Sequence, residues 1–79
     1  MTMYPRIREL RESAGYSQKQ IADRLFMSQT GYSKYETGNH DIPTAILIKF
    51  STIYNVSVDY ILGISDVPQI MMYEESISA

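Results

Sequence analysis

Two helical patterns near the middle of this chain are separated by only residues 26–27. The first follows Ser17 and Gln20, which have the spacing of a capping box, in which each side chain accepts a hydrogen bond from the other residue's backbone N–H. The second follows Ser28, another N-cap residue, and predicts a helix from Gln29 to Glu36. A connection this short makes the second helix cross the first steeply. The chain is therefore expected to fold around a tight helical hairpin.

Three further helices are predicted on either side of this hairpin. A first helix begins at Pro5, a fourth runs from Pro43 to about Tyr54, and Ser57 caps a short fifth helix through Leu62. The residues expected on the inward face of the first helix are Ile7, Leu10 and Ala14. The residues suited to a left-handed backbone after the helix ends are Gly15, Asn55 and Gly63.

The predicted fold class is all-α, a compact five-helix domain over residues 1–64, because no alternating strand pattern interrupts the helical ones. Residues 65–79 have no clear period and are interpreted as a tail, either disordered or contributing to dimerisation. The chain has no cysteine and a single histidine, so apolar packing must stabilise the fold. No signal peptide and no run of roughly 20 apolar residues is found, which favours a cytoplasmic protein over a secreted or membrane protein.

Charge is unevenly distributed along the chain. Residues 1–49 hold seven basic and five acidic side chains, a balance of +2, whereas residues 50–79 hold four acidic and no basic ones, a balance of −4. A mildly basic face suits a module that binds nucleic acid, although charge runs are more often ordinary solvated surface. The asymmetry alone therefore does not assign a function.

The run GYSQKQIADRLFMSQTGYSKYETG, followed by IPTAILIKFSTIYNVSVDYILG, resembles the Cro and lambda-repressor-like helix-turn-helix family, often called the XRE family. The resemblance covers about Ile7 to Gly63. Its ordered markers are Arg11, Gly15, Ser17-Gln18, Ile21-Ala22, Leu25, Ser28-Gln29, Ser33-Lys34-Tyr35-Glu36, Gly38, Pro43 and Val56-Ser57-Val58-Asp59-Tyr60-Ile61-Leu62. It implies a compact lambda-repressor-like domain in which the helix from Gln29 enters the major groove of DNA.

Four outward positions of that helix match the family's base-reading positions: Gln29, Thr30, Ser33 and Lys34. Gln29 could pair with the N6 and N7 atoms of adenine, and Thr30 could offer its methyl group to thymine or its hydroxyl to a base or phosphate. The Lys34 ammonium could donate a hydrogen bond either to a guanine edge or to a phosphate. For Gln29, the plain alternative is an exposed residue in the first turn of a helix.

The resemblance also implies phosphate contacts around both helices, from Gln18, Lys19, Ser28, Thr37, Asn39 and His40. Arg11 and Glu36 match the family's structural ion pair, which joins the first helix to the end of the recognition helix. Glu36 is thus expected to support the fold rather than to do chemistry.

Two residues depart from the family pattern. Phe26 occupies the turn position where the family often has glycine, so the turn has either a different backbone or an apolar contact for Phe26. Gly31 lies within the recognition helix, where glycine costs about 1 kcal/mol relative to alanine. It either permits close approach to DNA or leaves the helix frayed.

The fourth helix is more apolar than one inward face requires. Ile46 and Ile53 are candidates for a self-association patch, and a fully buried helix explains them equally well. The segment Ile70 to Tyr73 is a candidate to join such an interface. There is a physical reason for dimerisation, because one recognition helix contacts few base pairs and two copies contact more.

The sequence thus predicts a transcriptional regulator, a repressor by preference, that binds a palindromic operator in double-stranded DNA as a homodimer in the cytoplasm, associated with the nucleoid. No cofactor, metal or small-molecule ligand is implied. The alternative is a protein-interaction module, such as the antitoxin partner of a toxin, in which DNA binding is secondary. An enzyme would require a catalytic constellation, and no motif places a nucleophile or a paired carboxylate beside His40.

Overall fold

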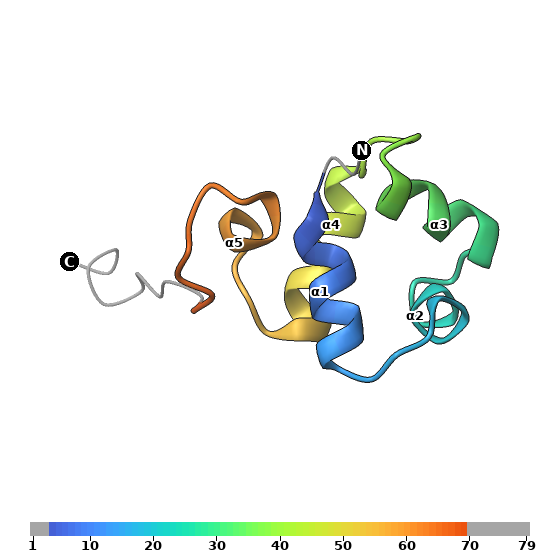
Figure 1. Cartoon of the computed structure of the whole chain (residues 1–79), viewed down its shortest axis with the longest axis horizontal. Coiled ribbons are helices and arrows are strands. Elements are labelled where there is room, and N and C mark those ends of the chain that lie inside the picture. Colours follow the sequence, from blue (N-terminus) through green and yellow to red (C-terminus); the bar gives the residue numbers. More distant parts are fainter. Residues whose placement is uncertain (1–3, 70–79) are drawn as a thin grey trace.

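A computed structural model describes residues 4–69 of the chain, and this part contains helices and no strands (Figure 1). The helices are α1 (Pro5–Ser13), α2 (Gln18–Arg24), α3 (Gln29–Thr37), α4 (Thr44–Tyr54) and α5 (Val58–Leu62). The predicted all-α, five-helix architecture is confirmed. None of the helices in the described part is long and apolar enough to cross a membrane.

Serine side chains begin three of these helices as the sequence predicts. The hydroxyls of Ser17, Ser28 and Ser57 accept hydrogen bonds from backbone N–H groups three residues later, at 3.1, 3.0 and 3.0 Å respectively. The capping box is complete, because the Ser17 backbone N–H also donates to the side-chain oxygen of Gln20 at 2.8 Å. These local bonds fix where α2, α3 and α5 start.

Two details of the helix ends differ from expectation. Pro43 precedes α4 in extended backbone, with φ −61° and ψ 150°, rather than occupying its first helical position. Ala14 is exposed and not on the inward face, because α1 already ends at Ser13. The left-handed residues after the helices are as predicted, with φ of +80° at Gly15, +55° at Asn55 and +83° at Gly63.

The core contains one large, fully buried side chain from each helix: Ile7, Ile21, Tyr32, Phe50 and Ile61. Tyr32 of α3 meets Phe50 of α4 edge to face, with ring centroids 6.2 Å apart. Burying an apolar side chain of this size contributes about 1.5–3 kcal/mol. Each helix is therefore tied to the common core by its own anchor.

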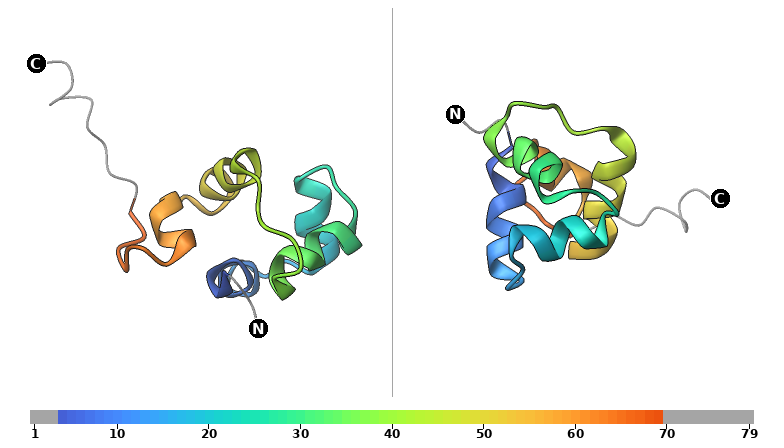
Figure 2. Two further views of the ribbon diagram at one scale, coloured as in Figure 1. Left: turned by 90° about the horizontal axis from the view of Figure 1, so that it is seen from above. Right: turned by 90° about the vertical axis from the view of Figure 1, so that its right-hand side faces the viewer.

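The helices surround this core in a fixed order. In Figure 1 and in the view from above in Figure 2, α1 and α4 lie in the middle, α2 and α3 on one side and α5 on the other. Helix α2 packs on α3, and α4 packs on α5. Helix α3 therefore lies on the side of the domain away from α5 and from the end of the described chain.

The surface of α4 lies between the two sequence-based interpretations, a self-association patch and a fully buried helix. Ile46 and Ile53, the candidates for a self-association patch, are both half-buried and pack against the core. The exposed apolar residue on this helix is Ile48, with 57% of its surface accessible. The candidate segment Ile70 to Tyr73 lies outside the described residues.

The described chain after α5 forms hydrogen bonds with α1 and with the residue before α5. The Arg6 guanidinium of α1 donates to the Tyr60 carbonyl at 2.8 Å and to the Asp66 carboxylate at 2.8 Å, and lies 4.0 Å from the centre of the Tyr60 ring. The Ser57 backbone N–H donates to the Pro68 carbonyl at 2.9 Å. The attached structure thus extends beyond residue 64, to Pro68.

We expect Ser17→Ala to lower the free energy of unfolding by about 1 kcal/mol, because it removes the hydroxyl that caps α2. Urea unfolding followed by circular dichroism measures the change. Ser13→Ala, at an exposed position at the end of α1, is the matched control and should shift stability by less than about 0.5 kcal/mol. Equal effects of the two substitutions would show that the cap contributes nothing specific.

Candidate nucleic-acid interface

Glu36, in the last turn of α3, is the buried charged residue within residues 4–69, with 5% of its surface accessible. Its carboxylate accepts two hydrogen bonds from Arg11 of α1, Nε to Oε2 at 2.6 Å and Nη2 to Oε1 at 3.2 Å. This fork-to-fork arrangement is a strong, directional form of ion pair. The two residues that the family resemblance pairs are therefore in direct contact.

Two further side chains donate to the same carboxylate. Gln18, the first residue of α2, donates from Nε2 to Oε1 at 3.1 Å, and the Tyr32 hydroxyl donates to Oε2 from within α3. Glu36 thus connects α1, α2 and α3 through one functional group. The family resemblance implies that Gln18 supports the recognition helix as well as binding phosphate, but it does not name Glu36 as its partner. The Tyr32 donor was missed, although Tyr32 and Glu36 are four residues apart on one helix, a spacing that places their side chains next to each other.

These bonds control ionisation in the network. Burial works against the charged form of Glu36, but the hydrogen bonds from Arg11, Tyr32 and Gln18 outweigh it and hold the pKa of the carboxyl below its ordinary value. Burial, together with the bond to Glu36, raises the pKa of Tyr32. Glu36 is consequently a carboxylate and Tyr32 a neutral donor at physiological pH.

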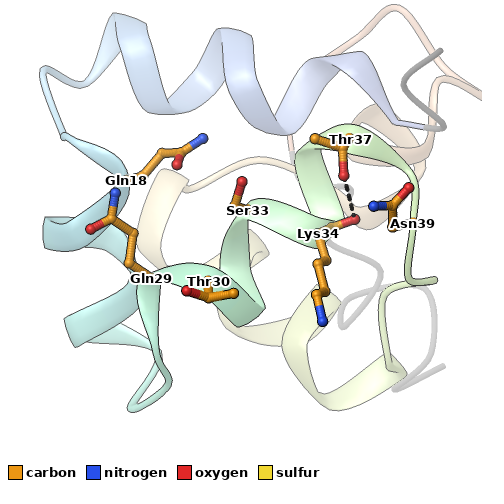
Figure 3. Close-up of a pocket in the computed structure, with 7 residues that line it drawn as sticks. All are labelled: Gln18, Gln29, Thr30, Ser33, Lys34, Thr37 and Asn39. Atoms are coloured by element: carbon orange, nitrogen blue, oxygen red, sulfur yellow. Dashed lines mark hydrogen bonds between the residues drawn. The ribbon is translucent and has the colours of Figure 1, made fainter.

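A shallow hollow of about 320 Å³ lies over the outward side of α3 (Figure 3). Its lining residues are Gln18, Gln29, Thr30, Ser33, Lys34, Thr37 and Asn39. They come from the start of α2, the length of α3 and the loop that follows α3. All four predicted base-reading residues are therefore brought together, along with three of the six predicted phosphate-binding residues.

The side chains of the hollow are polar, and lysine is its single basic contributor. In Figure 3, Gln18 and Gln29 lie side by side at one end, while the Lys34 side chain extends outward from the middle of α3. The Thr37 hydroxyl donates to the Lys34 carbonyl at 3.4 Å. The surface thus offers amides, hydroxyls and one ammonium group, all of which can form hydrogen bonds to a ligand.

The other three predicted phosphate-binding residues lie outside this hollow. Lys19 is 72% accessible at its side chain and lies 3.5 Å from Asp23 on the same helix. The Ser28 hydroxyl is engaged as the N-cap of α3, and His40 is exposed, with its backbone N–H donating to the Lys34 carbonyl at 3.1 Å. Within residues 4–69, no group of three or more metal-binding side chains could hold a metal ion.

The turn between α2 and α3 has the backbone that glycine would supply, but with Phe26 in that place. Phe26 has a φ of +58°, and the N–H groups of Phe26 and Met27 donate to the carbonyls of Asp23 and Ala22 at 3.1 and 3.0 Å. This is a Schellman ending, in which the left-handed residue is usually glycine. A residue with a side chain costs about 1–2 kcal/mol in this conformation, and the Phe26 side chain is 89% exposed rather than packed on the core.

Gly31 makes room for the N-cap of its own helix. A β-carbon at Gly31 would lie 3.1 Å from the Ser28 hydroxyl oxygen and 3.2 Å from the terminal carbon of Met27. The Gly31 N–H is also the group that Ser28 caps, at 3.0 Å. This crowding gives a local reason for glycine at position 31, in addition to the close approach to DNA or the fraying that the sequence suggests.

The Helix-turn-helix family model matches residues 7–61, which include most of α1, all of α2 to α4 and most of α5. The chain belongs to the helix-turn-helix family. Its α2, the left-handed turn at Phe26, and α3 form the motif for which the family is named.

Two regulators from Bacillus subtilis (strain 168) are similar to this helix-turn-helix chain. The HTH-type transcriptional regulator ImmR is 42% identical over 67 residues, 85% of this chain and 53% of ImmR. The SPbeta prophage-derived uncharacterized HTH-type transcriptional regulator YonR is 42% identical over 57 residues, 72% of this chain and 53% of YonR. This helix-turn-helix chain therefore spans about half the length of the curated relatives it matches.

We expect Glu36→Gln to lower the free energy of unfolding by about 3 kcal/mol at pH 7, because Arg11 loses the countercharge of a buried pair. The folded-state pKa of Glu36 is lowered, so its contribution is complete above the ordinary carboxyl pKa of about 4.3 and is lost as pH falls through the folded-state value. The gap between the two proteins should close over that acidic range.

Urea unfolding at a series of pH values between 7 and 3 measures this gap. Glu9→Gln is the matched control, since Glu9 is exposed on α1 and should change stability little at any pH. Parallel curves for wild type and Glu36→Gln across the acidic range would contradict the role of the ionised carboxylate.

Proposed function

We propose that this chain binds double-stranded DNA sequence-specifically and regulates transcription in the cytoplasm, as a repressor by preference, with α3 in the major groove. The observation that carries the proposal is the polar hollow along the outward side of α3, held in place by the buried Glu36 network. An α-helix fits the major groove, where base edges present distinct donors and acceptors. The names of ImmR and YonR as transcriptional regulators support the same function.

The outward residues of α3 are proposed to contact the base edges. Gln29 and Thr30 stand in its first turn, where a helix that enters a groove end-on meets base edges. Gln29 can bond adenine through N6 and N7, and Thr30 can contact the methyl group of thymine. Ser33 and Lys34 lie one turn later, where the Lys34 ammonium donates a hydrogen bond to a guanine edge or to a phosphate.

Residues before and after the base-reading part of α3 are proposed to contact phosphates. An amide NH₂ has two hydrogens, so Gln18 can donate one to Glu36 and the other to a phosphate oxygen. Lys19 is exposed beside it, and Ser28 lies at the start of α3. Thr37, Asn39 and His40 follow at the other end, so the proposed backbone contacts flank the base-reading residues on both sides.

Two copies are proposed to bind a palindromic operator as a homodimer. A single α3 of nine residues reaches only a few base pairs, whereas two copies related by a two-fold axis read half-sites about 34 Å apart. The domain proposed for this role covers residues 1–64, with residues 65–79 contributing to dimerisation rather than to base reading. No metal or cofactor is required for any of these contacts.

We expect Gln29→Ala to weaken binding to the preferred operator by about 1–3 kcal/mol, because a bidentate base contact is lost. Binding to a random duplex should change much less, since phosphate contacts supply most of that affinity. Selection of sites from a random duplex library by the purified chain identifies the operator, and fluorescence anisotropy then measures both affinities. An equal loss on both duplexes would remove Gln29 from base reading.

We expect Lys19→Ala to reduce the slope of log affinity against log salt by about one, because one phosphate contact is lost. Anisotropy titrations at several salt concentrations give the slope. Arg8→Ala is the matched control, because Arg8 is an exposed basic residue of α1, paired with Glu12 at 3.2 Å, and does not line the hollow over α3. Equal slopes for Lys19→Ala and wild type would contradict the phosphate contact.

A further inference from the structure

Phe26 combines two unfavourable features that neither the fold nor the hollow over α3 uses. Its backbone is left-handed, at φ +58°, and its ring is 89% exposed. Glycine would satisfy the same turn without strain, and a polar side chain would suit water better. A strained residue that also exposes a large apolar side chain points to a function for that side chain.

Phe26 borders a second, mainly apolar groove of about 280 Å³ between the α2–α3 turn and α4. Its lining residues are Arg24, Phe26, Ile48, Lys49, Thr52 and Ile53, none of which lines the hollow over α3. Ile48 is the exposed apolar residue of α4, and the Lys49 ammonium lies 5.5 Å from the centre of the Phe26 ring. The groove thus combines apolar side chains with two basic ones.

The two basic side chains of this groove, Arg24 and Lys49, favour a ligand that carries negative charge. Pairing of the groove with the same groove of another copy would place Arg24 and Lys49 against their own counterparts, which is repulsive. A complementary segment needs apolar side chains next to acidic ones. Residues 70–75 of this chain, Ile-Met-Met-Tyr-Glu-Glu, have that order, in a C-terminal part that has no basic residue from position 50 onward.

The described chain ends on the side of the domain away from its own α2–α3 turn. The Arg6 bonds to Tyr60 and Asp66 hold residues 64–68 beside α1 and α5. Figures 1 and 2 place this end of the domain opposite the α2–α3 turn, with α1 and α4 between them. The four apolar residues follow Gln69 at once and span at most about 14 Å when fully extended.

We propose that residues 70–75 of one copy bind the Phe26 groove of a second copy, and that the exchange is reciprocal. Apolar side chains of the segment cover Phe26 and Ile48, while Glu74 and Glu75 meet Arg24 and Lys49. Reciprocal exchange gives a closed two-fold dimer. The inference rests on the proposed two-copy function for its purpose, but the contact itself requires no DNA.

The first test is sedimentation equilibrium of the full chain without DNA over a range of concentrations. Wild type should form a dimer, and Phe26→Gly should raise the dimer dissociation constant at least tenfold. Because glycine adopts the left-handed turn without strain, this variant should melt no lower than wild type, which separates lost association from lost folding. Ile64→Ser is the matched control, since Ile64 is 73% exposed outside the groove, and it should leave the constant unchanged.

The second test exchanges the charges. The variant Arg24→Glu with Lys49→Glu and the variant Glu74→Lys with Glu75→Lys should each be monomeric alone, because like charges meet in both contacts. A mixture of the two should restore the dimer to within about tenfold of wild type, since both contacts are then complementary. Docking of the segment within its own copy predicts no such restoration.

Three results would overturn the inference: a wild type that stays monomeric, a dimer that Phe26→Gly leaves unchanged, or a mixture that remains monomeric. The DNA-binding proposal is tested separately by the Gln29→Ala specificity measurement, which depends on α3. A chain that reads its operator through Gln29 but fails these association tests would keep the first proposal and lose this one.

Discussion

The buried carboxylate of Glu36 is the interaction on which the placement of α3 depends. Removing a charge from water costs several kcal/mol unless good partners replace the solvent. Here Arg11 from α1, Gln18 from α2 and Tyr32 from α3 all donate to it, so every strong acceptor position of the carboxylate is used. Because the partners come from three helices, the charge is satisfied only when those helices are correctly positioned. The network therefore favours one arrangement of α1, α2 and α3 over a loosely packed alternative.

This constraint divides α3 into two sides with different tasks. Tyr32 and Tyr35 bury their rings, which meet edge to face at 6.3 Å, and Glu36 completes the inward side. The outward side carries amides, hydroxyls and one ammonium group over a shallow hollow. Hydrogen bonding to base edges demands that donors and acceptors be held to within fractions of an ångström, which a nine-residue helix cannot achieve alone. The buried side supplies the rigidity that the proposed reading of DNA by the exposed side requires.

Helix boundaries were predictable because their signals are local. Serine caps and left-handed residues act within four positions of themselves, so α2, α3 and α5 begin where the sequence indicates. Contacts between elements were not predictable in the same way. The bond from Gln18 to Glu36 and the exposure of Ile48 in place of Ile46 and Ile53 both depend on how helices meet. The family resemblance supplied the partner of Arg11, which periodicity alone does not identify.

The turn at Phe26 shows why a departure from a family pattern is informative about surface rather than fold. Its two Schellman hydrogen bonds and the partly buried Met27 keep the glycine-type backbone without a glycine. The geometry between α2 and α3 is therefore set by the flanking residues, and the side chain at position 26 is free to serve another purpose. The Phe26 side chain lines one groove together with the exposed Ile48 and two basic side chains. The groove shares no lining residue with the hollow over α3, so a protein segment can be its ligand without occupying the residues proposed to contact DNA.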